Sequence, residues 1–363
     1  SRTNITVISG DFNSSTGAVF GQIGYEDAID IKYVNNDVYV LARNYPNTYI
    51  IKYSDDGSLL SPRKVGNTYL SPVIVSDKSE DSFRFLVTTG TFIYAAGNKN
   101  GIGSPSTIVS KYDMDLNFIS SSTFSNSDLR SLAVAGDYLY GCVQNPNAAI
   151  VKIDSQNLSL SDSLTFLASP SYFCGDIIAT DKLYAFLTDD YGYNYVSASP
   201  LDQINSNTIT QLSTLGNAVG FKFAANSSNI FAFSFGSPTF SVYRYNIDDF
   251  NNPVNLYQDT TLPYTFSVTD GFVALGYSYY NSATSNFNYS VLTFSTDTFR
   301  VFNKYTIDTG SNDYIRKMVS DTENSVYITG DTYYCKSFGC DIDVRTLKLT
   351  NVNAIENRAP VLT

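Results

Sequence analysis

A short apolar segment that occurs seven times constrains the fold more than any other feature of this sequence. The copies start at residues 37, 91, 137, 181, 229, 270 and 324, at intervals of 41 to 54 residues. Three of them read DVYVLAR, DYLYGCV and DKLYAFL. Aromatic and β-branched residues bounded by Asn, Asp, Gly or Ser favour β-strands. The chain is therefore expected to consist of seven equivalent β units.

Each unit is expected to contain four strands. An apolar strand and a turn precede each copy, as in residues 28–36 (AIDIKYVNN), which predicts a hairpin. A third strand follows, as at 107–115 (TIVSKYDMD), and usually a fourth, as at 118–124 (FISSSTF). A single meander of this kind cannot bury both faces, so the units are expected to pack radially. The sequence predicts an all-β fold, a seven-bladed β-propeller of four-stranded antiparallel blades.

The ends of the chain suggest how the propeller is closed. Residues 17–24 (GAVFGQIG) precede the first inner strand just as residues 118–124 precede the third. The N-terminal segment is therefore expected to provide the outer strand of the last blade. The predicted organisation is an N-terminal extension at 1–16, the propeller at 17–350, and a linker toward a possible further domain at 351–363.

Two segments resemble known families. Residues 321–349 (DTENSVYITGDTYYCKSFGCDIDVRTLKL) resemble the bacterial-type β-propeller repeat, while the other six units share only its apolar skeleton. This resemblance implies the fold over residues 17–350 and an extracellular multidomain protein, but it transfers no functional residue. Residues 356–363 (ENRAPVLT) resemble the opening of cadherin-like and immunoglobulin-like modules, and a plain Pro-containing linker is the alternative.

Composition excludes several classes of function. The absence of histidine removes Ser-His-Asp and Cys-His nucleophiles and ordinary zinc, copper and non-haem iron sites. A net charge of -11 without a basic cluster disfavours nucleic acid and anionic membranes as partners. No apolar run is long enough for direct membrane insertion. We therefore expect a protein that is not an enzyme and has neither a cofactor nor a metal.

The cysteines and sequons fit an extracellular or cell-surface location. Cys142 and Cys174 are expected on one face of neighbouring blades, where they form a disulfide, and Cys335 and Cys340 bracket a loop that a second disulfide would close. Four free, mostly buried thiols are the alternative. Candidate glycosylation sites are Asn4, Asn13, Asn157, Asn226 and Asn288.

The loops between second and third strands are rich in tyrosine, which suits binding of glycans and proteins. Packing of these rings across hairpins is the alternative interpretation. The candidate ligand-binding residues are Tyr45, Tyr191, Tyr193, Tyr279, Tyr280 and Tyr334.

Charged residues at aligned positions of the innermost strands predict a mixed-charge channel. They are Asp30, Arg84, Arg130, Asp176, Lys222 and Arg316.

The favoured function is a non-catalytic binding or adhesion propeller of a modular surface or filament protein, with a protein or glycan partner. The alternatives are a purely structural module of an extracellular assembly and a carbohydrate-active enzyme that uses Asp30 or Asp176.

Overall fold

The computed structural model describes most of the chain. It describes residues 5–8, 26–44, 47–54, 59–61, 64–65, 68–69, 73–76, 81–99, 105–144, 146–167, 171–212, 215, 221–234, 239–298, 300–307, 311–321, 324–336, 339–350 and 352. The chain forms two compact units, one of residues 80–262 and one of residues 1–79 with 263–363. Each unit is built from four-stranded antiparallel sheets, called blades below and numbered in chain order.

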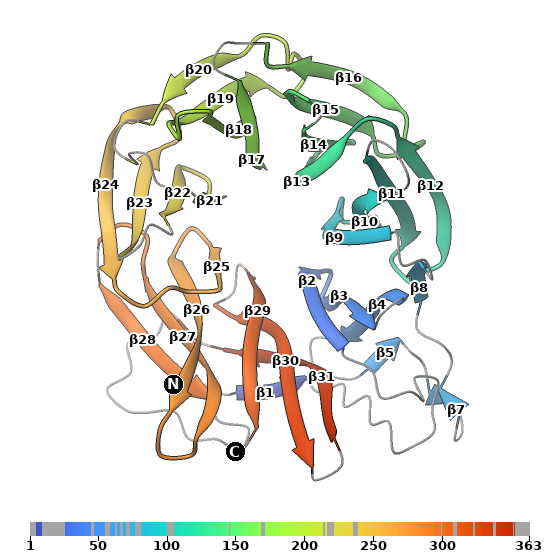
Figure 1. The fold of residues 1–363 in the computed structure, drawn as a ribbon, viewed down its shortest axis with the longest axis vertical. Coiled ribbons are helices and arrows are strands. Elements are labelled where there is room, and N and C mark those ends of the chain that lie inside the picture. Colours follow the sequence, from blue (N-terminus) through green and yellow to red (C-terminus); the bar gives the residue numbers. More distant parts are fainter. Residues whose placement is uncertain are drawn as a thin grey trace. The chain divides into compact units, whose positions relative to one another are not determined.

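The unit of residues 80–262 contains four blades, and in each the strands pair in chain order from the innermost outwards (Figure 1). Blade 2 comprises β9 (Asp81–Thr88), β10 (Phe92–Lys99), β11 (Ser106–Asp113) and β12 (Phe118–Phe124). Blade 3 comprises β13 (Asp128–Ala135), β14 (Tyr138–Gln144), β15 (Ala148–Asp154) and β16 (Leu160–Thr165). Blade 4 comprises β17 (Tyr172–Ala179), β18 (Lys182–Asp189), β19 (Asn194–Pro200) and β20 (Thr208–Gln211). Blade 5 comprises β21 (Phe221–Ala225), β22 (Asn229–Ser234), β23 (Phe240–Asn246) and β24 (Asp249–Asp259).

The other unit contains three blades. Blade 1 comprises β2 (Glu26–Val34), β3 (Asp37–Asn44), β4 (Asn47–Ser54) and β5 (Leu59–Ser61), with β8 (Val73–Ser76) also paired to β4. Blade 6 comprises β25 (Thr265–Val268), β26 (Phe272–Asn281), β27 (Asn286–Ser295) and β28 (Val301–Ile307). Blade 7 comprises β29 (Asn312–Ser320), β30 (Val326–Lys336), β31 (Gly339–Leu349) and β1 (Ile5–Ile8). A separate hairpin joins β6 (Lys64–Val65) and β7 (Thr68–Tyr69).

This architecture is a seven-bladed β-propeller, as the sequence predicts. The seven repeated segments are the second strands of the blades, namely β3, β10, β14, β18, β22, β26 and β30. The N-terminal strand does close the last blade, since β1 pairs with β31 from Ile5↔Leu349 to Ile8↔Thr346. That strand is formed by residues 5–8, within the segment expected to be an extension. Residues 17–24, the expected source, lie outside the described residues.

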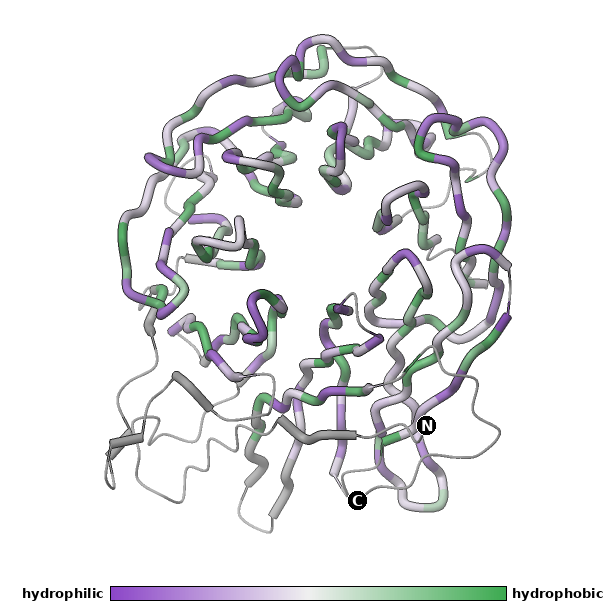
Figure 2. The backbone as a smooth tube through the Cα atoms, turned by 180° about the vertical axis from the view of Figure 1, so that it is seen from behind, coloured by the Kyte–Doolittle hydropathy of each residue, from purple (hydrophilic) through white to green (hydrophobic). Residues whose placement is uncertain are grey.

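Local sequence explains the shape of a blade. Asn35 and Asn36 have φ of 53° and 63°, the two successive positive values that a tight hairpin turn requires. Second strands are almost fully buried, whereas an outer strand such as β12 alternates between exposed and partly buried positions. The same alternation of hydrophilic and hydrophobic residues runs along the outer strands in Figure 2. The core therefore lies between the faces of adjacent blades, with the second and third strands at its centre.

A hydrogen bond between neighbouring blades recurs at the end of the second strand. The amide oxygen of Asn98 accepts the backbone N–H of Leu129 at 2.7 Å, and that of Gln144 accepts the N–H of Cys174 at 3.0 Å. Each donor residue directly precedes a β-bulge in the inner strand of the next blade. A bulge interrupts the pairing of the strand that contains it. We call this bond the inter-blade latch.

The other unit contains the same latch at equivalent positions. Ser278 Oγ accepts the N–H of Ile315 at 3.1 Å, and Asp331 Oδ1 accepts the N–H of Ala28 at 2.9 Å. Ile315 and Ala28 also directly precede bulges. Because an unpaired buried N–H costs about 1–3 kcal/mol, each latch both joins two blades and satisfies a donor that the bulge exposes.

Tyrosines of the second strands form a second set of bonds between blades. The hydroxyl of Tyr140 donates to the carbonyl of Leu201, in the next blade, at 2.9 Å. These tyrosines of the repeated segment are therefore structural. Equivalent bonds join Tyr94 to Ser155 and Tyr184 to Ile247.

The disulfide between Cys142 and Cys174 joins blades 3 and 4 and confirms the predicted pairing. Both residues are buried, at 0% and 8% exposure, and they are 32 residues apart. Cys335 and Cys340 are direct partners in the β30–β31 pairing. Their side chains lie outside the described residues, so the second disulfide stays a prediction.

Removal of the first disulfide is expected to destabilise the protein. For a closed loop of this length, the loss of chain entropy in the unfolded state corresponds to about 4 kcal/mol. The double variant Cys142→Ala, Cys174→Ala should therefore unfold at a clearly lower denaturant concentration than the wild type without reductant. With reductant added after unfolding, the refolding midpoints of the two proteins should converge. Equal midpoints without reductant would contradict this role.

The buried tyrosines predict loss of stability in alkali. Burial raises the pKa of Tyr140 and Tyr184 to about 12, above the ordinary value of about 10. Because the folded-state pKa is the higher one, this contribution to stability is complete below pH ~10 and disappears as the pH rises toward 12. The double variant Tyr140→Phe, Tyr184→Phe should show a shallower decline of the denaturation midpoint over this range. The exposed substitution Tyr191→Phe is the control.

Candidate binding surfaces

A rigid turn in blade 4 presents two of the predicted tyrosines. The carboxylate of Asp189, at the end of β18, accepts the backbone N–H groups of Tyr191 at 2.9 Å and Tyr193 at 2.8 Å. Its second oxygen accepts the hydroxyl of Tyr195 at 3.0 Å. Gly192 has a φ of 84°, which only glycine adopts without strain. One buried carboxylate thus fixes the whole turn.

The two tyrosines belong to a larger exposed apolar surface. Tyr191 is 70% exposed and Tyr193 41%; Leu167, in the segment between blades 3 and 4, is 80% exposed, and Phe173, in β17, is 48% exposed. The backbone N–H of Ser171 donates to Asp190 at 3.1 Å and thereby joins that segment to the turn. We call Leu167, Phe173, Tyr191 and Tyr193 the blade-4 loop surface.

Packed aromatic rings support the blade-4 loop surface. The ring of Tyr195 packs edge-on against Tyr172 at 5.2 Å, and Tyr172 packs against Phe166 at 6.3 Å. The cluster that contains these rings also contains Cys142 and Cys174, the disulfide between blades 3 and 4. The exposed side chains therefore stand on a layer that is crosslinked as well as packed.

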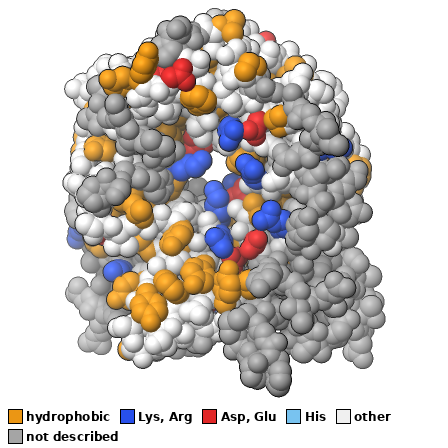
Figure 3. All heavy atoms as spheres, viewed as in Figure 1, with side chains coloured by type: hydrophobic (Ala, Val, Ile, Leu, Met, Phe, Trp, Pro, Cys, Tyr) orange, Lys and Arg blue, Asp and Glu red, His pale blue; other side chains and the backbone are white. Residues whose placement is uncertain are grey.

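Blades 6 and 7 contain a second aromatic surface. The rings of Tyr280, Phe287, Tyr314 and Tyr333 follow one another with centroids 5.1–5.2 Å apart. Tyr279, 53% exposed, lies beside this strip with the ammonium of Lys304 at 5.9 Å from its ring. Figure 3 shows hydrophobic side chains gathered over the β26–β27 hairpin and β29. We call these four rings, which pack at tilted and edge-on angles, the aromatic strip; of them, only Tyr280 was among the predicted residues.

Several predicted residues are not placed by the structure. Tyr45 lies outside the described residues, as do Asn4 and Asn13. The backbone of Tyr334 belongs to β30, but its side chain is not described. These residues stay predictions.

The three remaining sequons differ in accessibility. Asn157 is exposed in the turn between β15 and β16, and Asn226 is half-buried in the turn between β21 and β22. Asn288 is 1% exposed, which leaves no room for a glycan on its side chain in the folded protein. Asn157 is therefore the most accessible of the sequon asparagines that the structure describes.

The inner-strand charges do not occupy one position, because β-bulges shift the register. Arg84, Arg130 and Arg316 are themselves bulge residues, and their side chains are exposed. Asp30 and Asp176 come one residue after the bulge and are buried. A bulge re-aims the side chains on either side of it. The prediction that these charged residues occupy equivalent positions of the inner strands is therefore wrong.

Two of these arginines, Arg130 and Arg316, pair with acidic residues of their own blades. Arg130 pairs with Asp128, and Arg316 Nε donates to Asp331 Oδ2 at 2.6 Å. Burial raises the pKa of the Asp331 carboxyl, while the Ala28 N–H and the Arg316 guanidinium act in the opposite direction. Asp331 is thus both the latch acceptor and the partner of a cation, a role that sequence reasoning missed.

Asp176 joins the inner strands of three blades. Its Oδ1 accepts a hydrogen bond from the hydroxyl of Ser131, in blade 3, at 2.6 Å. The same oxygen accepts the backbone N–H of Ile177, the next residue, at 3.0 Å. Its Oδ2 accepts the N–H of Phe223 from blade 5 at 3.1 Å. Both oxygens of this candidate catalytic carboxylate are therefore held by protein donors.

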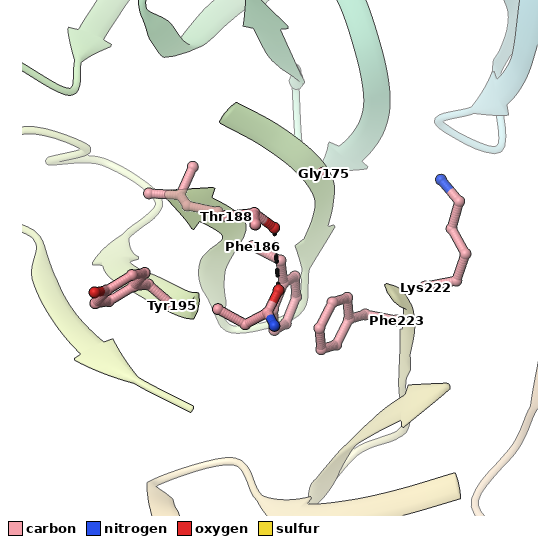
Figure 4. Close-up of a pocket in the computed structure, with 8 residues that line it drawn as sticks. Gly175, Phe186, Thr188, Tyr195, Lys222 and Phe223 are labelled. Carbon is pink, nitrogen blue, oxygen red and sulfur yellow. Dashed lines mark hydrogen bonds between the residues drawn. The ribbon is translucent and has the colours of Figure 1, made fainter. Parts of the chain in front are cut away.

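A pocket of about 240 Å³ lies between blades 4 and 5. The stacked rings of Phe186 and Phe223 form its apolar side, and the hydrogen-bonded pair of Thr188 and Asn194 forms a polar side (Figure 4). Its lining consists of Gly175, Phe186, Leu187, Thr188, Asn194, Tyr195, Lys222 and Phe223.

Among the described residues, no group of three or more His, Cys, Asp or Glu could hold a metal ion. No helix in the described part of the chain is long and apolar enough to cross a membrane.

Comparison with known proteins shows the fold and no family. No protein-family model matches the chain, and no curated protein matches it. Among solved structures, it is similar to the WD40 repeats of RRP9, with a TM-score of 0.61 and 9% identity over 95% of this chain and 97% of that one. U3-55K gives a TM-score of 0.59 and 9% identity over 96% and 98% of the two chains.

A prolyl endopeptidase structure is also similar, with a TM-score of 0.57 and 10% identity over 91% of this chain. The match covers 51% of that protein, so this chain spans about half its length. Identities this low show a shared β-propeller fold and leave the function to be argued from this chain's own residues.

The structural role of Asp176 leads to a prediction about stability. Asp176→Ala leaves three donors without their acceptor and should lower the free energy of unfolding by about 3 kcal/mol. Ser131→Ala removes one of these donors and should cost about 1 kcal/mol. Denaturant unfolding measures both, and an Asp176→Ala protein as stable as the wild type would refute the role.

Proposed function

We propose that this protein is a non-catalytic extracellular binding propeller that recognises a protein or glycan partner through the blade-4 loop surface. The observation that carries the proposal is the exposure of Tyr191 and Tyr193 on a turn fixed by Asp189. Apolar side chains of this size, grouped and exposed on a rigid base, mark interaction surfaces.

Rigidity matters because binding must offset the entropy of the groups that it immobilises. A loop side chain that becomes fixed costs about 0.5–1.5 kcal/mol, and a turn held in place beforehand avoids much of this cost. Tyrosine adds a large flat ring and a hydroxyl with few rotatable bonds. The blade-4 loop surface combines both properties, and the aromatic strip of blades 6 and 7 is a second surface of similar chemistry.

Two features support an extracellular or cell-surface location. A buried disulfide such as Cys142–Cys174 is typical of proteins that fold in oxidising compartments. The exposed Asn157 begins a sequon in a surface turn, where glycosylation of a secreted protein occurs. Both features fit a module of a larger surface or filament protein.

The absence of catalysis is part of the proposal. Asp176 is held by donors from three blades, and Asp30 is buried 3.7 Å from Lys32 Nζ. A glycosidase needs two carboxyl groups that face one substrate, one of them able to protonate the leaving group. The engagement of Asp176 with backbone and hydroxyl donors supports a structural role.

The outer strands favour a second candidate function, that of a structural module. Large apolar side chains are exposed on outer strands of five blades, which offers contacts for lateral assembly with other molecules. They are Phe118, Ile119, Leu160, Ile209, Val254 and Val301.

The proposed binding function is tested with labelled protein on an array of immobilised glycans and an array of secreted proteins. We expect at least one glycan or protein to be bound, and the double variant Tyr191→Ala, Tyr193→Ala to bind it at least ten-fold more weakly with an unchanged melting temperature. Phe118→Ala, on the outer strand β12 and 61% exposed in the wild type, is the matched control and should bind normally.

Binding that the double variant retains in full would overturn the proposed site. Blank arrays, together with self-association that Phe118→Ala weakens, would favour the structural module instead.

A further inference from the structure

The junction between blades 4 and 5 differs from the four junctions at which the structure shows the inter-blade latch. Asn98, Gln144, Ser278 and Asp331 each reach the next blade through the inter-blade latch. Thr188 is the equivalent residue of β18, but its hydroxyl donates to Asn194 Oδ1, in its own blade, at 3.0 Å. Within the residues that the structure describes, Thr188 makes no latch to blade 5.

The pocket lies at this junction. Thr188 and Asn194 line one side, and Lys222 and Phe223 of the inner strand β21 line the other. The bulge residue of β17 is Gly175, which also lines the pocket, whereas the bulge residues of β9, β13 and β29 are arginines. At this junction the described residues show neither a latch from Thr188 nor a side chain at the bulge residue, and both positions line the pocket.

The lining of the pocket suits an amphipathic ring. Its volume of about 240 Å³ is below the ~300–1,000 Å³ of pockets for drug-sized ligands, so it accommodates one ring rather than several. Phe186, Leu187 and Phe223 offer apolar contacts, while the hydroxyl oxygen of Thr188, which donates its proton to Asn194, can still accept a hydrogen bond. A pyranose has the same division, with apolar C–H faces and a rim of hydroxyl groups.

Lys222 supplies the charge preference. Its side chain is exposed, and its ammonium extends from β21 away from the rings of Phe186 and Phe223 (Figure 4). It forms no ion pair with any residue that the structure describes. Asp176, the acid next to Gly175, has both oxygens engaged by protein donors. An anionic group at the outer side of the pocket would pair with this ammonium once the exposed lysine side chain changes rotamer toward it.

We propose that this pocket binds a single acidic sugar residue, a uronic or sialic acid. The sugar ring lies against Phe186 and Phe223 with hydroxyl groups toward Thr188 and Asn194, and its carboxylate pairs with Lys222. The pocket adjoins the blade-4 loop surface, because Thr188 and Asn194 flank the turn that presents Tyr191 and Tyr193. The inference rests on the proposed binding function and names the ligand class for that site.

Because the net charge of the protein is -11, an acidic sugar would be recognised through short-range contacts only. A strongly acidic protein repels anions at long range, so an acidic sugar gains affinity only from contacts within the pocket. The pairing of its carboxylate with Lys222 is exposed and should weaken as ionic strength rises.

The test uses ligand-observed NMR with the methyl glycosides of glucuronic, galacturonic and N-acetylneuraminic acid. We expect at least one acid to bind and its methyl ester, which has the same ring without the charge, to bind at least ten-fold more weakly. Lys222→Gln should weaken binding of the acid ten-fold, and Lys222→Arg should restore most of it. Arg84→Gln removes an exposed inner-strand cation outside the pocket and should change nothing.

A second variant tests the pocket itself. Thr188→Gln places at the junction the residue that forms the latch in blade 3, so it should fill the pocket and abolish binding without lowering the melting temperature. Equal binding of acid and ester, no binding of any acid, or full binding by Thr188→Gln would overturn the inference. If the Tyr191→Ala, Tyr193→Ala protein alone lost a partner, the proposed function would stand and the acidic-sugar pocket would fail.

Discussion

The bond on which this structure depends is the hydrogen bond from a bulged inner strand to the second strand of the preceding blade. A β-bulge interrupts the pairing of the inner strand and leaves an N–H that must find an acceptor outside its own sheet. Four residues supply that acceptor in three chemical forms, the amides of Asn98 and Gln144, the hydroxyl of Ser278 and the carboxylate of Asp331. What the fold conserves is thus the position of an acceptor oxygen rather than the identity of a residue.

The interactions that hold the fold rigid also favour the proposed binding function. The disulfide and the packed rings beneath the blade-4 loop surface hold together two blades that contribute to it, and Asp189 holds the turn above them. Exposed aromatic side chains on such a base lose little entropy when a partner binds. The same geometry also explains why most tyrosines of the repeat are unavailable to ligands, since residues such as Tyr140 are buried with the hydroxyl bonded to the next blade.

Function in a repeat protein is most readily placed where one repeat departs from the rest. At the junction of blades 4 and 5, Thr188 donates a hydrogen bond to Asn194 of its own blade. The bulge residue of β17 is Gly175, whereas three other blades have arginine at the bulge. The pocket lies at these local changes, and its lysine, Lys222, forms no ion pair with the described residues.

The sequence alone determined the blade number, the strand order and the Cys142–Cys174 pairing, because these follow from periodicity and from strand order within one repeated unit. It also predicted closure by the N-terminal segment, but from residues 17–24 rather than from Ile5–Ile8. It also singled out Tyr191 and Tyr193, since polar-flanked aromatic loops are local features. Only the tertiary structure shows the latch and the pocket. It alone also shows that Asp176 follows a bulge whereas the arginines are themselves bulge residues. A bulge shifts the register by one residue without a distinctive sequence signal, and the latch joins residues about 30 or more positions apart across blades.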